Sequence, residues 1–330
     1  MSRYEELKRI FQKGKYFKVV CGAGNEDPAE VYKLTLVYAL AGATAIDISA
    51  NVDVVKSAVT ALDKAEELAP KLKRKIKIRP FINVSVGLKG DPHVRKARIK
   101  YNICIKCGKC LEACLQGAIN NDFIIQEIRC IGCGACERVC GQKAVEFYNR
   151  KVDFDRILPE CIANGTETLE LHAIIPDDNA VMADWGVIDS LIPNNFISMC
   201  LDRSQLSDTH LIRRIKEVYE ISGSRLVIQA DGAPMSGGKD DYNTTLQTIA
   251  IADIIRKSKI PVFVTASGGT NSKTGELAKL CGVEINGVAI GTFARKIIKD
   301  HIGKKDFQGN IKLIEKAVST AEKLILDNMR

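Results

Sequence analysis

The stretches CIKCGKCLEAC (residues 104–114) and CIGCGACERVC (residues 130–140) decide what kind of domain lies in the middle of this chain. Both read Cys-x2-Cys-x2-Cys-x3-Cys, and each cysteine of the second run lies 26 residues after its counterpart in the first. This is the ligand pattern of a bacterial-type pair of 4Fe-4S clusters, in which the fourth cysteine of each run binds the other cluster. The pattern therefore predicts one cluster on Cys104, Cys107, Cys110 and Cys140 and another on Cys130, Cys133, Cys136 and Cys114.

The alternative for so many cysteines is zinc. Zinc ribbons pair Cys-x2-Cys units and close after four ligands, whereas each loop here carries a third cysteine and the whole unit is repeated. The repeat extends to the flanks, where IKYNI (99–103) and IIQEI (124–128) precede the runs and QGAI (116–119) and QKAV (142–145) follow them. Each half thus predicts a strand, a cluster loop, a short helix and a strand, so we expect residues 98–148 to form a ferredoxin-like domain in which clusters replace much of the hydrophobic core.

The chain departs from the usual ferredoxin pattern directly after each fourth cysteine. Leu115 and Gly141 stand where a proline is usual. Proline is not a ligand, so this change bears on the reduction potential, which hydrogen bonding and solvent access control, and not on cluster assembly.

Outside the cysteine region, apolar strands alternate with Gly-rich turns and amphipathic helices. Continuous β-branched runs of this kind predict a parallel sheet that is buried on both faces. Eight strands are expected, at residues 17–21, 45–48, 78–86, 169–174, 196–201, 225–229, 261–265 and 287–290. Eight strands in this length match a TIM-like (β/α)8 barrel, formed by residues 1–97 and 149–330, with a doubly wound open sheet as the alternative.

The ferredoxin-like domain follows the third predicted strand. In a barrel the loops that follow strands form the C-terminal mouth, where active sites lie, so the clusters are expected at that mouth. The glycine-rich loops after strands seven and eight predict an anion site for a phosphate-bearing ligand, with flavin mononucleotide as the first candidate. The residues expected to bind it are Gly268, Gly269, Thr270, Gly291 and Asp231.

Other polar residues also lie at predicted strand ends. His172 and Lys239 are candidates to orient or protonate the ligand, with an ordinary buried histidine as the alternative for His172. The four cysteines outside the repeat are expected to be packed thiols: Cys21, Cys161, Cys200 and Cys281.

Composition narrows the class of protein. The chain has 330 residues, twelve cysteines and a formal charge of +8, which two loaded clusters would reduce to about +4. No secretory signal opens it, and its longest uncharged run, residues 34–46, is too short to cross a bilayer, so a cytoplasmic protein without membrane contact is expected.

Nucleic acid is not expected as a partner, because no basic stripe with interleaved aromatic residues accompanies the charge. Lys100, Lys106 and Lys109 are either solvated or a docking site for an acidic redox partner.

Several stretches resemble the LdpA (light-dependent period) proteins of cyanobacteria. They are residues 17–25 (FKVVCGAGN), 36–42 (LVYALAG), 79–97 (RPFINVSVGLKGDPHVRKA), 231–237 (DGAPMSG) and 266–271 (ASGGTN). The resemblance spans most of the chain in the same order, with the ferredoxin-like region at the same place. It implies an iron–sulfur protein that senses cellular redox state and reports it to the circadian clock. The eight cluster cysteines match, but nothing in this chain identifies a clock partner.

Three functions are compatible with these features. The first is redox sensing and electron transfer, with the cluster state read by a signalling partner or redox partner through the barrel. The second is an oxidoreductase that passes electrons from the clusters to a flavin or a phosphorylated substrate at the mouth. The third is a plain electron carrier, which leaves about 280 residues of barrel without a purpose.

Overall fold

The protein is described here by a computed structural model that covers residues 1–88, 90–91, 94–149, 153–233 and 238–329. Pro92 and His93, and the stretch 234–237, belong to the segments quoted above and lie outside the described residues. No helix in the described ranges is long and apolar enough to cross a bilayer.

Eight parallel strands close into a barrel, in the order β1-β10-β9-β8-β7-β6-β3-β2. They are β1 (Tyr16–Val20), β2 (Ala45–Ser49), β3 (Phe81–Gly87), β6 (Thr168–His172), β7 (Ile197–Leu201), β8 (Leu226–Asp231), β9 (Phe263–Ser267) and β10 (Gly287–Ile290). Closure is complete because β1 pairs with both β10 and β2, with Val19 opposite Ile290 on one side and Ile46 on the other. The predicted TIM-like barrel is confirmed, and the open sheet is excluded.

Two strands begin two or three residues later than predicted, and proline explains both shifts. The strand expected from residue 78 begins at Phe81, directly after Pro80, and the strand expected from residue 261 begins at Phe263, two residues after Pro261. Proline has no N–H to donate to the ladder, so pairing starts beyond it.

Helices cover the outside of the barrel and join its strands. They are α2 (Pro28–Ala41), α3 (Val52–Leu68), α6 (Phe154–Ala163), α7 (Asp178–Leu191), α8 (Asp208–Ser222), α9 (Leu246–Lys257), α10 (Thr274–Leu280), α11 (Thr292–Ile302) and α12 (Ile311–Met329), with short 3-10 turns η2 (Gly223–Arg225) and η3 (Phe307–Gly309). Their apolar faces pack on the strands to form the main core, which includes fully buried Trp185, Leu171 and Val264. Burial of this apolar surface is the main force that stabilises the barrel.

A helix that the sequence pattern did not predict covers the N-terminal end of the barrel. This helix, α1 (Arg3–Gln12), is capped by Ser2, whose hydroxyl accepts from Glu5 N at 3.2 Å. Its Phe11 packs against Tyr16, Phe196 and Phe263, with ring centroids 4.4 to 5.2 Å apart. The aromatic cluster seals this end, so the other end is the open mouth.

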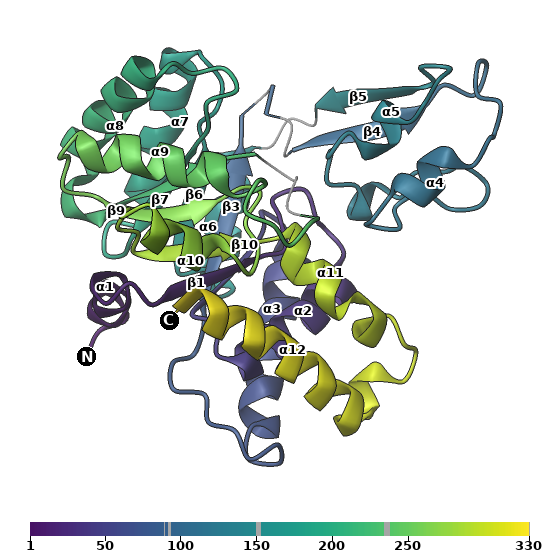
Figure 1. Ribbon diagram of the computed structural model, residues 1–330, viewed down its shortest axis with the longest axis horizontal. Coiled ribbons are helices and arrows are strands. Elements are labelled where there is room, and N and C mark those ends of the chain that lie inside the picture. The colour runs from purple at the N-terminus through teal and green to yellow at the C-terminus, as the bar shows by residue number, and fades with distance from the viewer. Residues whose placement is uncertain (89, 92–93, 150–152, 234–237, 330) are drawn as a thin grey trace.

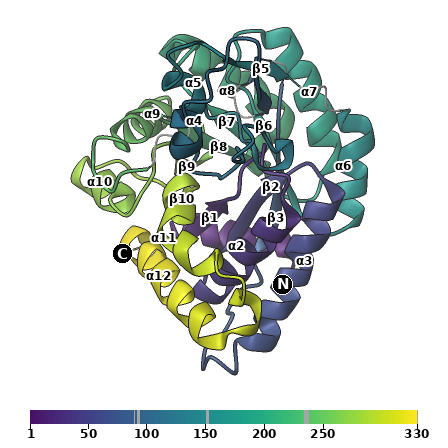
Figure 2. The same ribbon diagram turned by 90° about the vertical axis from the view of Figure 1, so that its right-hand side faces the viewer.

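The cysteine-rich segment is inserted between β3 and β6. It consists of β4 (Arg95–Ile99), α4 (Lys109–Ala113), η1 (Glu127–Arg129), α5 (Ala135–Arg138) and β5 (Val145–Asn149). β4 and β5 pair antiparallel, with Arg95 opposite Asn149 and Ile99 opposite Val145, and all eight cysteines of the repeat lie between them. The segment projects to one side of the barrel in Figure 1, and in Figure 2 it lies in front of the barrel strands.

Candidate functional site

The internal repeat of the inserted segment is present in the backbone. Three residue pairs separated by 26 positions have positive φ angles: Lys106 (51°) and Gly132 (67°), Gly108 (83°) and Gly134 (77°), and Gly117 (60°) and Lys143 (52°). Left-handed backbone is uncommon outside glycine, so the two lysines adopt it because the loop requires it. The two cysteine loops therefore share one backbone path.

The first three cysteines and the last one lie around one cavity. This cavity, of about 130 Å³, is lined by Cys104, Cys107, Cys110 and Cys140, together with apolar side chains such as Phe123 and Val145. Three of the thiols come from one loop and the fourth comes from the other run, which is the arrangement that the spacing predicts.

The remaining four cysteines form the second group. Burial, followed by the charges of the neighbouring Cys133, Cys130 and Cys114, raises the pKa of Cys136 to about 12. Cys114 therefore lies near the second loop, although it belongs to the first run. Such a cluster of thiols in a buried place is costly to ionise unless a cation or a metal cluster compensates the charge.

Backbone N–H groups donate to the sulfurs at equivalent places. Ala118 N lies 3.3 Å from Cys114 Sγ, and Ala144 N lies 3.2 Å from Cys140 Sγ. A third such contact joins Ala97 N of β4 to Cys130 Sγ at 3.4 Å. Hydrogen bonds of this kind stabilise thiolate charge and tune the potential of a bound cluster.

The second cysteine group is the one that lies on the barrel. The buried ammonium of Lys96 on β4 donates to three carbonyls: Gly24 O in the loop between β1 and α2 at 2.6 Å, Glu127 O at 2.8 Å and Cys130 O at 2.9 Å. Two further contacts join the same loop to η1, from Glu26 N to Ile128 O at 2.7 Å and from Arg129 Nε to Asp27 Oδ2 at 2.8 Å. The inserted segment is thus held against the mouth through the loop that follows β1.

A cavity of about 90 Å³ lies at the mouth. The residues that line it include all five that were predicted to bind a ligand there: Gly268, Gly269, Thr270, Gly291 and Asp231. Ile131, which follows Cys130, lines the same cavity, so the second cysteine loop forms part of its wall. The cavity therefore adjoins the second cysteine group, not the first.

The structure explains one of the mouth glycines. A Cβ at Gly268 would lie 1.7 Å from Asp231 Oδ1, so only glycine leaves room for this carboxylate. The hydroxyl of Thr270 donates to Ala289 O at 2.6 Å, which fixes the loop to β10. Loops seven and eight therefore come together at the cavity, and a carboxylate lies beside them.

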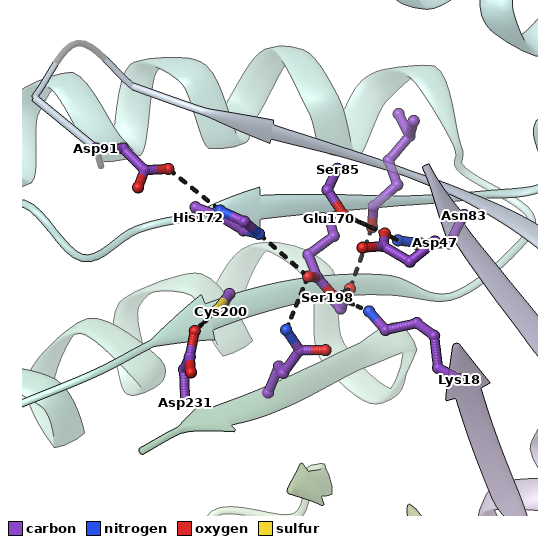
Figure 3. A network of polar contacts seen from close by, with 12 residues as sticks. Lys18, Asp47, Asn83, Ser85, Asp91, Glu170, His172, Ser198, Cys200 and Asp231 are labelled. Atoms are coloured by element: carbon purple, nitrogen blue, oxygen red, sulfur yellow. Dashed lines mark hydrogen bonds and ion pairs between the residues drawn. The ribbon is translucent and has the colours of Figure 1, made fainter. Parts of the chain in front are cut away.

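The inner wall of the cavity is a network of buried ionisable groups (Figure 3). Glu170 on β6 is its centre, since its Oε2 accepts from Lys18 Nζ at 2.6 Å and from Ser198 Oγ at 2.7 Å. Its Oε1 accepts from Gln229 Nε2 at 2.9 Å and lies 3.5 Å from His172 Nε2.

Two further carboxylates complete the outer part of the network. His172 Nδ1 lies 3.2 Å from Asp91 Oδ2, and the thiol of Cys200 donates to Asp231 Oδ2 at 3.3 Å. Asp91 is part of the segment between β3 and β4, so this ion pair also ties the inserted segment to the barrel.

A second pair of polar contacts lies deeper in the barrel. The carboxylate of Asp47 accepts from Asn83 Nδ2 at 2.6 Å and from the hydroxyl of Ser85. These side chains replace the apolar layers that usually fill such a barrel.

Burial and neighbouring charges shift the pKa values of this network in different directions. Burial raises the pKa of Glu170, but the charge of Lys18 and a hydrogen bond from His172 outweigh it and hold that pKa well below its usual range. Burial opposes charge on His172, yet its bonds to Asp91 and Glu170 raise the pKa of the imidazole well above its usual value. Burial, with Asp231 and Glu170 nearby, raises the pKa of the Cys200 thiol. In the absence of a bound cation, Glu170 and His172 therefore form an ionised pair and Cys200 stays protonated; a metal at this place would displace the protons of His172 and Cys200.

Some sequence-based assignments need correction. Cys281 is exposed at the end of α10 and is not a packed thiol, whereas Cys21, Cys161 and Cys200 are buried as expected. Lys239 is exposed and is not among the described residues that line the mouth cavity. His172 is at the cavity as expected.

Four members of the site were not predicted from the sequence: Lys18, Glu170, Cys200 and Gln229. A signal was present for two of them: Lys18 interrupts an apolar strand, and Glu170 stands two residues before His172, so both point to the same side of β6. No comparable sequence pattern indicates that Cys200 and Gln229 belong to the site.

The amino-acid sequence of the chain is similar to a known protein family and to a protein from a cyanobacterium. Residues 161–327 match the family described as the light dependent period A C-terminal domain. The protein "Light dependent period A" of Synechococcus elongatus is 27% identical over 358 aligned residues, which cover 95% of this chain and 91% of the relative.

Solved structures resemble the chain only distantly. The YdjI aldolase of Escherichia coli has 9% identity and a TM-score of 0.47, with 96% of this chain and 90% of that chain covered. A tryptophan synthase of M. tuberculosis has 11% identity and a TM-score of 0.46, with 100% and 99% covered. The assignment of a barrel therefore rests on the strand order of this chain itself.

Proposed function

The chain belongs to the light dependent period A family, and on this premise we propose that it is a redox-responsive iron–sulfur protein that carries two 4Fe-4S clusters in a ferredoxin-like insertion. The relative's name links that protein to light. In the proposal, the cluster state of this chain alters the mouth of the barrel, and a partner reads the change.

The grouping of the eight cysteines is the observation that carries the proposal. Four thiols line a single cavity whose other walls are largely apolar, and the remaining four gather beside the barrel. Sulfur donors in sets of four, drawn from both runs, fit a pair of cubane clusters, and the N–H groups that donate to Cys114 and Cys140 supply the usual stabilisation of thiolate ligands. When bound, the clusters supply one-electron transfer.

The chain's own residues give the second group a route to influence the barrel. Lys96 holds Cys130 O and Gly24 O together, and Ile131 extends into the wall of the mouth cavity. An added negative charge at the second group would attract the Lys96 ammonium and weaken its hold on the loop between β1 and α2. The mouth can therefore respond to redox state without a large movement.

The first group faces solvent and suits contact with a redox partner. Cys107 is exposed, as are its neighbours Lys106 and Ile105, and Ile105 leaves 65% of its surface accessible. An apolar side chain surrounded by lysines fits an acidic protein that delivers or removes electrons. Electrons would enter at the first group and reach the barrel from the second.

Metal analysis and spectroscopy test this proposal. Protein reconstituted under anaerobic conditions should hold about eight iron and eight sulfide per chain. Cys114→Ala should perturb the site of Cys130, Cys133 and Cys136 although Cys114 belongs to the other run, and Cys161→Ala, a buried thiol in α6, should change nothing. About four iron per chain in the wild type, or stoichiometric zinc at the eight cysteines, would contradict the proposal; damage confined to the Cys104 site in Cys114→Ala would contradict the crossed ligation.

One observation favours a second function, an oxidoreductase that acts at the mouth. Gly268 and Gly269 both have positive φ angles, 68° and 75°, and their loop lines the same cavity as Gly291 at the start of α11. Backbone amides at such places bind phosphate groups. A volume of about 90 Å³ is well below the 300–1,000 Å³ of typical sites for drug-sized ligands, so the cavity holds the phosphate end of a ligand more readily than a whole flavin.

An absorption spectrum separates the two functions. Flavin bands in anaerobically purified protein, or binding of flavin mononucleotide that is lost in Gly269→Val while the iron content stays constant, would favour the oxidoreductase. Cluster absorption alone, with no phosphate-dependent binding at the mouth, would favour the sensor.

A further inference from the structure

Three side chains at the mouth bring an imidazole, a thiol and a carboxylate to one point. The donor atoms of Glu170, His172 and Cys200 all lie within 4.8 Å of one another, and all three residues are buried. We propose that these residues bind a single divalent metal ion of the zinc class, separate from the cysteines of the inserted segment.

The strands place the donors where a metal needs them. His172 on β6 is the register partner of Cys200 on β7, and Glu170 lies two residues before His172 on the same face of the strand. A tetrahedral zinc ion with bonds of about 2.0–2.3 Å holds its ligand atoms roughly 3.3–3.7 Å apart. The His172 and Glu170 donors are already 3.5 Å apart, so only the Cys200 sulfur has to approach, by at most about 1 Å, which a rotation about its χ1 supplies without a backbone shift.

The partners of these three residues resemble the outer layer of a metal site. His172 Nδ1 contacts Asp91 at 3.2 Å while Nε2 faces Glu170 at 3.5 Å, the arrangement in which a carboxylate orients a metal-binding imidazole. Lys18 and Ser198 both bind Oε2 of Glu170, so they fix the carboxylate and leave Oε1 toward His172.

Two features of the cavity favour a cation with an open position. Four carboxyl groups gather around the inner wall, those of Asp47, Asp91, Glu170 and Asp231 (Figure 3). Gln229 is 4% exposed and lines the cavity, and its Oε1 has no hydrogen-bond partner among the described residues. A water bound to the metal on the cavity side would donate to this oxygen, and the cavity has room for a few waters.

The donor set selects the class of metal. Magnesium and calcium take oxygen ligands almost exclusively, while one thiolate with one imidazole and one carboxylate suits zinc or a similar borderline ion. One thiol alone does not hold an iron–sulfur cluster, since these clusters need several cysteines. The site is therefore chemically distinct from both cysteine groups of the insertion.

Zinc binding to the iron-loaded protein tests the inference. Full-length protein is first reconstituted anaerobically with iron and sulfide, so that the eight cysteines of the insertion are occupied, and is then dialysed against zinc with a competing chelator. We expect about one zinc per chain in addition to the iron. Cys200→Ala and His172→Gln should reduce zinc to near zero at unchanged iron content, and Cys161→Ala should leave both metals unchanged.

A near-isosteric variant and a spectroscopic probe keep the test independent of folding defects. Asp91→Asn leaves the three ligands in place and should weaken zinc binding about 10- to 100-fold, as loss of an outer carboxylate does. Cobalt bound to the wild type should show the charge-transfer absorption of a thiolate ligand and the visible bands of tetrahedral cobalt. Wild-type protein that takes up no zinc, or zinc that remains in both Cys200→Ala and His172→Gln, would overturn the inference, as would cobalt spectra without a thiolate ligand.

Discussion

The barrel and its insertion are stabilised in different ways. The barrel buries a continuous apolar core of strand and helix side chains, and α1 seals its N-terminal end with an aromatic cluster. The hydrophobic cluster of the inserted segment is small and contains two buried cysteines: Ala97, Ile99, Ala118, Ile119, Cys130, Cys136 and Val145. A segment of about 55 residues with so little apolar burial needs another source of stability, whereas the barrel does not. The two regions should therefore respond in opposite ways to loss of iron and to loss of apolar contacts.

Removal of iron should have the largest effect. Anaerobic chelation should abolish the slow amide exchange of residues 95–149, because the thiols alone do not replace the clusters, while β1 and β6 to β10 keep their protection. Hydrogen exchange resolved by residue measures both regions at once. Equal protection of the insertion with and without iron would show that its fold does not depend on the metal.

Two phenylalanine truncations should each affect one region and leave the other unchanged. Phe11→Ala removes the centre of the aromatic cluster under the barrel and should lower the free energy of unfolding of the barrel by about 3–5 kcal/mol, with iron content unchanged. Phe123→Ala, at the wall of the first cysteine cavity, should instead lower iron retention and leave barrel unfolding nearly unchanged. Chemical denaturation and iron analysis of both variants measure the contrast, and a similar loss of iron in the two would refute it.

The contact between the two regions should depend on Lys96. Its ammonium is buried with three carbonyl partners and lies 3.5 Å from Glu26, so Lys96→Met leaves these acceptors without their charged donor. We expect the free energy of local opening at residues 24–26 and 127–130 to fall by about 2–3 kcal/mol, which is measured as faster amide exchange. Lys100→Met is the matched control, because that side chain is 39% exposed and should cost little. Equal effects of the two substitutions would argue against a buried anchor.

The smallest expected effect is a pH dependence confined to the barrel. Although partial burial raises the pKa of Asp178, its bonds to His210 and Arg214 lower that pKa to about 2. Because the pKa is lower in the folded state than in the unfolded chain, where it is about 3.9, the carboxylate stabilises the folded state at any pH above that value. This contribution to the free energy of unfolding is lost as the pH falls toward 2. Asp178→Asn should therefore cost about 1 kcal/mol near neutral pH, after allowance for solvent screening, and almost nothing near pH 2. A difference between variant and wild type that is independent of pH would contradict this origin.

Local sequence pattern was sufficient for the strands of the barrel and for the cysteine repeat. Apolar runs and the glycines after them are properties of short segments, so the eight strands were predicted within a few residues, except where Pro80 and Pro261 delay pairing. The equal spacing of the two cysteine runs likewise predicted loops of equal backbone path, since Gly108 and Gly134 allow the same left-handed turn. Helix α1 was not predicted although its local signals were present, namely the cap at Ser2 and the apolar spacing of Leu7, Ile10 and Phe11. Only its position under the barrel depends on aromatic side chains of distant strands.

The chemistry of the mouth was decided only by the tertiary structure. Lys18, Glu170 and Cys200 come from three strands and share no spacing in the chain, yet barrel closure brings the ammonium of Lys18 and the thiol of Cys200 next to the carboxylate of Glu170. Asp91 reaches His172 from the linker to the insertion, a contact between residues 81 positions apart. Sequence alone determined which segments form strands and which cysteines occur in sets, because both are local patterns. Which ionisable groups face one another depended on the order and register in which eight strands close, and no local pattern contains that information.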